Sequence, residues 1–351
     1  MLKVGLIGLG MMGRMHLGAY QKNPDVEIAA VADKMVQKLK GDISGGGNIA
    51  TDQNVFDFSN VNCYDNAEDL IKDKDLDIVD ICLPTHLHAD FTVKALESGK
   101  HVLCEKPMGR SLEECDRMIA AAGENNKKLM IGQCLRFWPE YEVLKDYIEN
   151  KKLGQLTGLF CFRGGGTPGW ADDRGRSWFL QKDKAGGALL DMHIHDIDMV
   201  NYLLGIPENV SSCGKNLIKG SGYDTISTNY LYPDGPVVNA ICSWVLQGDF
   251  GFKMSYLAVF EGANIVYDST TSPTIKINPN EGKSFSPDLP SEGAIAREID
   301  YFIKSIAGDK PIERVTPESA RDSIRIALAE MKSIDENKPV KIAGLLPKNS
   351  R

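Results

Sequence analysis

The segment LLDMHIHDID, residues 189–198, places two histidines and three aspartates within ten positions. A metal site, a proton relay and a polar helix face in water are the three interpretations to separate. On an α-helix, Asp191 and His195 share one face and Asp198 continues it. His193 points about 200° away from that face, so the two histidines cannot bind one ion. Zinc needs three or more converging ligands, and we therefore expect no metal here.

The residues just before this segment help to separate the remaining interpretations. GGALL, residues 186–190, has the composition of a buried stretch, and Gly186 and Gly187 permit close backbone approach. A buried setting argues against a helix face that only contacts water. We favour a proton relay in which His195, whose imidazole titrates near neutrality, takes a hydroxyl proton while a hydride leaves carbon.

A second segment whose residues could take part in a reaction is CEKP, residues 104–107, at the end of a β-branched run. Ligands of open parallel sheets bind beyond the carboxyl ends of the strands. Pro107 disfavours helical backbone at Lys106, so the lysine side chain is expected at that edge, where it can polarise a substrate oxygen. The tripeptide alone also fits an exposed surface lysine.

The sequence shows two kinds of pattern, and each predicts the helices and strands that must position these residues. Up to about residue 135, short β-branched runs alternate with helical patterns, which predicts a parallel, doubly wound sheet. Beyond about residue 155, longer strands joined by turns, including PDG at 233–235, predict an antiparallel sheet. We expect two domains, residues 1–135 and 136–351.

The first domain contains a glycine motif. Gly8, Gly10 and Gly13 form G-x-G-x-x-G between a predicted strand and a predicted helix, where backbone N–H groups can approach a pyrophosphate. The next strand ends at Asp33, whose carboxylate would bind ribose hydroxyls and repel a 2'-phosphate. The cofactor is expected to be NAD, although Lys34 could soften the repulsion and admit NADP.

Composition narrows the partners. The formal charge of −8 disfavours nucleic acid and anionic membranes, and no apolar run is long enough to cross a bilayer. The eight cysteines form no CxxC pair, which is typical of reduced thiols in a cytoplasmic protein.

Five motifs occur in a recognisable order: GLIGLGMMGRMH, LPTHLHAD, LCEKPMG, RFWPEY and GGALLDMHIHDID. In this order and spacing the chain resembles, over nearly its whole length, the glucose-fructose oxidoreductase / inositol dehydrogenase family, often written Gfo/Idh/MocA. The resemblance implies a Rossmann domain followed by an α/β domain with an open, mostly antiparallel sheet. It implies NAD(P)-dependent oxidation or reduction of a sugar or cyclic polyol. Relatives commonly pair their sheets between subunits, so a homodimer or homotetramer is expected.

The motifs and the resemblance together define the candidate site residues. The catalytic group would be Lys106, Asp191 and His195. The cofactor would contact Gly8, Gly10, Met11, Met12, Gly13, Asp33, Pro84, Thr85, His88, Glu105 and Lys106. The substrate would contact Lys106, Arg136, Arg163, Trp170, Trp178, Asp191 and His195. Residues 163–178 fit either a loop over the substrate or a solvated loop packed for stability, and His16 is expected to be structural.

Three functions remain open from the sequence. The first is a sugar or polyol dehydrogenase. The second is a glycosidase that uses bound NAD for transient oxidation of a ring hydroxyl. The third is a regulator that senses NAD or a sugar without catalysis, although such a protein has no need for Lys106, Asp191 and His195 together.

Overall fold

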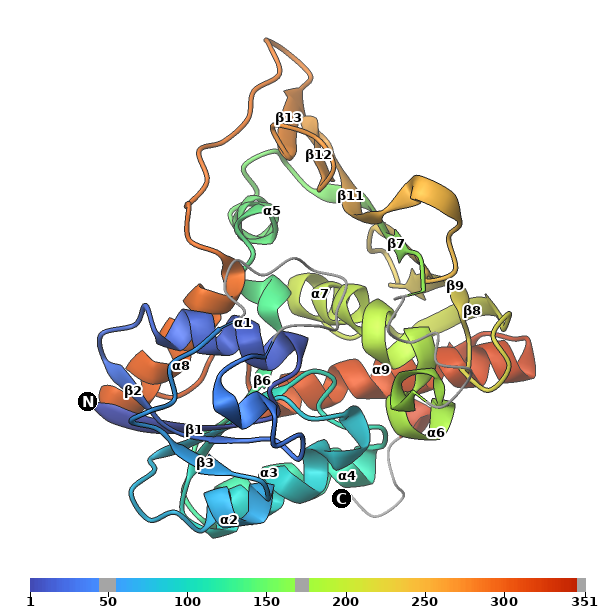
Figure 1. Ribbon diagram of the computed structural model, residues 1–351. Helices are drawn as coiled ribbons and strands as arrows, with labels where there is room; N and C mark the ends of the chain where they lie inside the picture. Colours follow the sequence, from blue (N-terminus) through green and yellow to red (C-terminus); the bar gives the residue numbers. More distant parts are fainter. Residues whose placement is uncertain (44–54, 168–176, 346–351) are drawn as a thin grey trace. The chain divides into compact units, whose positions relative to one another are not determined.

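The computed structural model describes residues 1–43, 55–167 and 177–345, and these form two compact units (Figure 1). The first unit comprises the described residues of 1–137 together with 292–321. The second comprises 138–167, 177–291 and 322–345. Among the described residues, no helix is both long enough and apolar enough to cross a membrane.

The first unit is built on a six-stranded parallel sheet in the order β3-β2-β1-β4-β5-β6. This order is that of a doubly wound dinucleotide-binding sheet, as the alternating pattern predicted. The central strands are mostly apolar because both faces of the sheet are covered, and β4 is buried at all four positions. The strands are β1 (Leu2–Ile7), β2 (Val26–Ala32), β3 (Asn62–Tyr64), β4 (Ile78–Ile81), β5 (His101–Glu105) and β6 (Leu129–Gly132).

Helices cover both faces of this sheet (Figure 1). On one face lie α1 (Met11–Tyr20) and α8 (Ala294–Ala307). On the other lie α2 (Ala67–Ile71), α3 (His88–Glu97) and α4 (Leu112–Glu124). The short turns of this unit are η1 (Lys38–Lys40), η2 (Thr85–Leu87) and η3 (Cys134–Phe137).

The position of α8 corrects the domain boundary expected from the sequence. We expected residues 136–351 to form one domain, but 292–321 joins the first unit. The reason is the apolar face of α8, where Ile299, Phe302 and Ile303 are fully buried and the helix packs against α1 and η3. An amphipathic pattern shows that a helix packs, but it does not show against which sheet.

The second unit is built on an eight-stranded sheet in the order β13-β12-β11-β7-β10-β9-β8-β14. All neighbours are antiparallel except β7 and β10, so the mostly antiparallel sheet expected from the sequence is confirmed. The PDG turn joins β9 to β10 as a hairpin. The strands are β7 (Leu156–Gly165), β8 (Asn209–Lys215), β9 (Thr225–Leu231), β10 (Val237–Ser243), β11 (Phe252–Phe260), β12 (Ala263–Asp268), β13 (Ile275–Pro279) and β14 (Val340–Lys341).

Helices of the second unit precede and follow its strands. The long helices are α5 (Pro139–Glu149), α7 (Ile194–Leu204) and, from residue 322 on, α9 (Pro317–Glu336). The first turn of α9 is capped by Thr316, whose hydroxyl accepts a hydrogen bond from Ser319 N at 3.1 Å. The short elements are η5 (Trp178–Leu180), α6 (Lys182–Ala185), η6 (Leu189–His193), η7 (Gly248–Phe250) and η8 (Ile342–Leu345).

Candidate active site

The predicted glycine turn lies between β1 and α1 in the first unit. Gly8 has a φ of +97°, and a Cβ atom there would lie 2.4 Å from the carbonyl oxygen of Cys82. A Cβ atom at Gly13 would lie 2.0 Å from the carbonyl oxygen of Gly8, so both positions require glycine. No described atom lies within 4 Å of the Cβ position at Gly10, which leaves the start of α1 open to an approaching group. These features fit a pyrophosphate at the N-terminal end of α1.

Asp33 follows β2 and is held by backbone amides and a lysine. Its Oδ2 accepts a hydrogen bond from Leu9 N, and its Oδ1 accepts one from Met35 N, both at 2.8 Å. The Nζ of Lys38 lies 3.6 Å from Oδ2 and donates to the carbonyl oxygen of Leu9. The sequence pointed to Lys34 as the neighbouring cation, but Lys34 is exposed and Lys38 is the lysine beside the carboxylate.

The position of Asp33 leads to a prediction about cofactor choice. Wild-type protein should prefer NADH to NADPH, and Asp33→Ala should reduce that preference by about ten- to a hundredfold because the repelling carboxylate is gone. Fluorescence titration of each protein with both cofactors measures the ratio of dissociation constants. The matched control is Lys34→Ala, which should leave the ratio nearly unchanged. A strong preference of the wild type for NADPH would mean that Lys38 or another cation outweighs Asp33.

Lys106 follows β5 at the carboxyl edge of the same sheet, as predicted, and it is partly buried. Glu105, the last residue of β5, is buried and its Oε2 accepts a hydrogen bond from Lys106 N at 3.1 Å. The other oxygen, Oε1, lies 3.1 Å from Nε2 of His16 on α1. The Nδ1 of the same histidine lies 2.7 Å from Oδ2 of Asp80 on β4. One histidine thus joins α1, β4 and β5 directly behind the lysine.

Charge holds this group together. Burial lowers the pKa of His16, but Asp80 and neighbouring Cys82 outweigh burial, so the net pKa lies well above its ordinary value. Burial raises the pKa of Glu105, but the His16 imidazole and the Lys106 ammonium outweigh it, so the net pKa lies below its ordinary value. At neutral pH these two shifts favour an imidazolium at His16 and a carboxylate at Glu105.

His16, Asp80 and Cys82 also offer three atoms that metals bind. The distance of 2.7 Å between Nδ1 and Oδ2 is that of a hydrogen bond. Nitrogen and oxygen ligands of a tetrahedral zinc ion, each at about 2.0–2.1 Å, lie farther apart from each other. Burial raises the pKa of the Cys82 thiol, which opposes the thiolate that zinc requires. The group is therefore a hydrogen-bonded ion cluster.

His88, a predicted cofactor residue, is buried at the start of α3. Its Nδ1 lies 2.8 Å from the carbonyl oxygen of Pro107, and its Nε2 lies 2.8 Å from that of Leu83. Burial holds the pKa of His88 below its ordinary value, although the two carbonyl oxygens act in the opposite direction because both could accept an N–H from the charged ring. Both ring nitrogens therefore face backbone, and the side chain ties the segment after β4 to the segment after β5.

The remaining predicted cofactor residues lie at the same edge of the sheet as the glycine turn. Met11 and Met12 open α1 and are partly buried. Pro84 precedes η2 and is partly buried, and Thr85 is the buried first residue of η2.

Asp191 and His195 belong to the second unit, on a helix that begins with a π-helical turn. The π turn is η6, and α7 continues from it. Both residues are partly exposed, while every residue between them is buried. The two side chains therefore share the accessible side of the helix, as their spacing predicted. The predicted close backbone approach is also present, since a Cβ atom at Gly187 would lie 2.5 Å from the carbonyl oxygen of Ser221.

The other polar residues of this helix face the interior of the second unit. His193 is fully buried, and its Nε2 lies 3.1 Å from Oε2 of Glu330 on α9. Asp198 does not continue the accessible face, contrary to the helical-phase prediction. It is buried and accepts a hydrogen bond from the hydroxyl of Ser323 on α9 at 2.8 Å. The packing of α9 against this side is a tertiary contact that spacing within one helix does not reveal.

Arg163 corrects a substrate-binding prediction. It lies within β7, which extends to Gly165, and its side chain is 2% exposed. Nε lies 2.8 Å from Oδ2 of Asp196, and Nη2 lies 3.1 Å from Oδ1 of the same carboxylate. Nη2 also lies 3.4 Å from the hydroxyl of Tyr141. This guanidinium forms a buried, bidentate ion pair with Asp196, and its role is therefore structural.

Arg136 corrects a second substrate-binding prediction. It is 2% exposed, and its Nη1 donates to the carbonyl oxygen of Arg314 at 2.8 Å. Its Nη2 donates to the hydroxyl of Ser319, also at 2.8 Å. The side chain therefore fastens the segment after α8 to the first unit.

Trp178, one of the two tryptophans predicted to contact substrate, is partly exposed in η5. Its ring packs edge-on against that of Phe179, with 5.7 Å between the ring centroids. Phe179 in turn packs against Trp244 at 5.1 Å. This aromatic row is compatible with stacking on a sugar and with packing alone. Trp170 lies outside the described residues.

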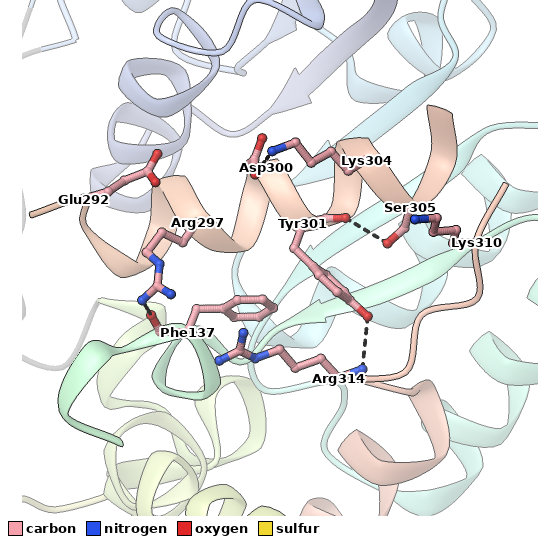
Figure 2. Close-up of a pocket in the computed structure, with 9 residues that line it drawn as sticks. All are labelled: Phe137, Glu292, Arg297, Asp300, Tyr301, Lys304, Ser305, Lys310 and Arg314. Atoms are coloured by element: carbon pink, nitrogen blue, oxygen red, sulfur yellow. Dashed lines mark hydrogen bonds and ion pairs between the residues drawn. The ribbon is translucent and has the colours of Figure 1, made fainter. Parts of the chain in front are cut away.

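A cavity of about 370 Å³ lies in the first unit, beside α8 (Figure 2). None of its lining residues is a candidate site residue. Within it the guanidinium of Arg314 stacks 4.3 Å from the Phe137 ring, and Arg297 donates to the carbonyl oxygen of Phe137 at 3.0 Å. The hydroxyl of Tyr301 accepts a hydrogen bond from Arg314 N at 3.1 Å. These contacts hold residues 292–321 in the first unit.

Comparisons with known proteins agree with this architecture. Residues 2–133 match the oxidoreductase family with an NAD-binding Rossmann fold, and residues 141–259 match the GFO/IDH/MocA C-terminal domain. The chain belongs to the GFO/IDH/MocA family, as the motifs indicated, and its first unit is an NAD-binding Rossmann domain.

Individual relatives give the level of similarity. The chain is 36% identical over 210 residues to levoglucosan dehydrogenase of Pseudarthrobacter phenanthrenivorans, a match to 58% of this chain and 51% of that protein. It therefore spans about half the length of this relative. It is 24% identical over 356 residues to myo-inositol 2-dehydrogenase of Thermotoga maritima, covering 98% of this chain and 100% of that one. A solved levoglucosan dehydrogenase, in complex with NADH and levoglucosan, shares the fold with a TM-score of 0.83 at 22% identity, covering 97% of this chain and 99% of that chain.

Proposed function

We propose that this protein is an NAD-dependent dehydrogenase that acts on a secondary alcohol or ketone of a sugar, a sugar derivative or a cyclic polyol. One observation carries the proposal: the open glycine turn, Asp33 and Lys106 follow β1, β2 and β5 at the carboxyl edge of one sheet. Dinucleotides bind at this edge, which brings a lysine to the reacting end. The names of the relatives, levoglucosan dehydrogenase and myo-inositol 2-dehydrogenase, support the substrate class.

The proposed mechanism assigns one task to each candidate residue. When bound, NAD supplies a nicotinamide ring that accepts or returns a hydride. In the oxidation direction His195 takes the hydroxyl proton as the hydride leaves the same carbon. Lys106 stabilises the negative charge that develops on the oxygen, and Asp191 orients a neighbouring hydroxyl or the imidazole. The products are a ketone, the reduced cofactor and one proton.

A screen of NAD reduction across inositols, hexoses, anhydrosugars, uronates and simple glycosides tests the proposal. We expect stoichiometric NADH with at least one polyol or sugar. Cleavage of a glycoside with no net NADH would instead show the transient-oxidation glycosidase. Binding of NADH with no turnover of any member, in protein that is fully folded, would contradict the proposed activity and favour a sensor.

We also propose that the protein is a homodimer or homotetramer assembled through the open face of the second unit's sheet. Phe160 on β7, Leu257 on β11 and Val266 on β12 lie in register in one row across neighbouring strands. They are 40%, 38% and 37% exposed, and Ile241 on β10 is 39% exposed. A contiguous apolar face of this kind is typical of a subunit interface.

A matched pair of leucine variants tests this assembly. Leu257→Glu should shift the protein towards monomer because it places a charge in the apolar row. Leu217→Glu adds the same charge at a leucine that is 65% exposed and lies outside the sheet, so it should leave the mass unchanged. Light scattering at micromolar concentration measures both. A monomeric wild type would refute the proposal, as would equal behaviour of the two variants.

A cytoplasmic location is part of the same proposal. All eight cysteines lie in the described part of the chain and are thiols outside any disulfide, including exposed Cys63 and Cys213. Free exposed thiols persist where the surroundings are reducing, and the cytoplasm also supplies NAD.

A further inference from the structure

The ion cluster behind Lys106 contains more ionisable groups than the packing of α1 on the sheet requires. His16, Asp80 and Glu105 come from α1, β4 and β5, and each is at most 5% exposed. The imidazole bridges the two carboxylates at 2.7 and 3.1 Å. Burying three ionisable groups is costly unless each is paired, so a core of apolar residues would be the simpler way to pack α1 on this sheet.

Three described groups lie against the carboxylate of Glu105. Oε1 faces His16 and Oε2 accepts the hydrogen bond from Lys106 N. On the β6 side, a Cβ atom at Gly132 would lie 3.1 Å from Oε1 and 3.3 Å from the Cα atom of Glu105. Glycine at position 132 therefore makes room for the carboxylate. The position of Glu105 fixes the backbone from which the Lys106 side chain projects.

We propose that His16, with Asp80, is a positioning residue that holds the Glu105 carboxylate in place and thereby sets the position of Lys106. The inference rests on the proposed function only in naming Lys106 as the catalytic lysine. Without the imidazolium, burial would dominate at Glu105 and the carboxyl group would take up a proton. Lys106 would then lose the carboxylate that accepts the hydrogen bond from its backbone N.

Three substitutions should have the same effect at Lys106. Glu105→Gln removes the carboxylate directly. His16→Gln removes the cation that keeps it ionised, and Asp80→Asn removes the partner that keeps His16 protonated while leaving the histidine in place. In each variant the Lys106 side chain should be held less firmly and should react faster with an acylating reagent. If His16 acts through Glu105, combining His16→Gln with Glu105→Gln should add nothing to the effect of Glu105→Gln alone.

Competitive acylation with acetic anhydride, without cofactor or substrate, measures the reactive amine of Lys106. Mass spectrometry compares it with exposed Lys74 in the same sample. We expect each single variant to raise the relative rate at Lys106 by about three- to tenfold, the scale of losing one neighbouring charge. The matched control is His101→Gln, at the opposite end of β5, where the Nδ1 atom accepts a hydrogen bond from Lys128 N. That variant should leave the rate unchanged.

Two results would overturn the inference: a rate at Lys106 that His16→Gln leaves unaltered, or a further change when His16→Gln is added to Glu105→Gln. If His16→Gln does not fold, Asp80→Asn provides the same test. An unaltered acylation rate at Lys106 in Asp80→Asn would also overturn the inference. With a substrate from the screen, His16→Gln should lower kcat by about tenfold or more through misplacement of the lysine, with little change in KM for NAD. A wild type without turnover would defeat the proposed function and leave the acylation result standing.

Discussion

Lys106→Met should abolish turnover, a loss of about a thousandfold or more, while the dissociation constant for NAD stays within a few-fold of wild type. Methionine keeps the length of the side chain and removes the charge that stabilises oxygen in the transition state. Cofactor binding should persist because the glycine turn and Asp33 follow β1 and β2, whereas Lys106 follows β5. Steady-state kinetics and a fluorescence titration with NADH measure the two quantities.

The matched control for this variant is Lys94→Met on α3. Lys94 is an exposed lysine of the same unit that pairs with Glu68, and it should tolerate the change with turnover intact. A Lys106→Met protein with near-normal turnover would remove the lysine from the mechanism. A protein that instead loses NADH binding would assign Lys106 to the cofactor and leave its role in the chemistry unsupported.

His195→Ala should lower turnover by about a hundredfold or more and should remove the acidic limb of the pH-rate profile. The limb arises because an imidazole that is already protonated cannot accept the substrate proton, so wild-type activity in the oxidation direction falls as the pH drops through its pKa. The variant has no such group, and its residual rate should be flat over that range. A limb that survives in the variant would place the base elsewhere.

The neighbouring histidine supplies the contrast. His193→Ala should leave the rate constant of the chemical step almost unchanged, because the side chain is buried against Glu330 on the other side of the helix. It should lower the free energy of unfolding by about 1–3 kcal/mol, since Glu330 loses a buried partner. EDTA should change neither variant. Greater loss of turnover in His193→Ala than in His195→Ala would show that the helical phase is wrong, and inactivation by chelation with recovery on zinc would support a metal.

The sequence was sufficient to predict the features that depend on residues close together in the chain. The glycine turn follows from the φ of Gly8 and from the close approach of Gly13 to it, and both constraints act within six residues. The hairpin at PDG and the cap at Thr316 are of the same kind. The period-four exposure of Asp191 and His195 survives the π turn because the same side of the helix remains accessible.

The sequence was insufficient to predict which side chains pair when they lie far apart in the chain. A buried arginine and a substrate-binding arginine look alike until the partner is known, and the partner of Arg163 is Asp196, 33 residues away. His16 was expected to be structural, but the sequence did not show that it contacts Glu105, 89 residues away. One signal was present: Asp80 interrupts an apolar run, IVDIC, and a charge inside a buried strand requires a partner. Nothing in the chain near Asp80 says that the partner is His16.

The most direct test of the central claim is a crystal structure of the protein with NADH and the best substrate from the screen. We predict that Lys106 Nζ and one ring nitrogen of His195 both lie within about 3.2 Å of the same substrate oxygen. The carbon that bears this oxygen should face the nicotinamide ring. A substrate oxygen that meets neither residue, or one that meets a metal ion in their place, would contradict the account.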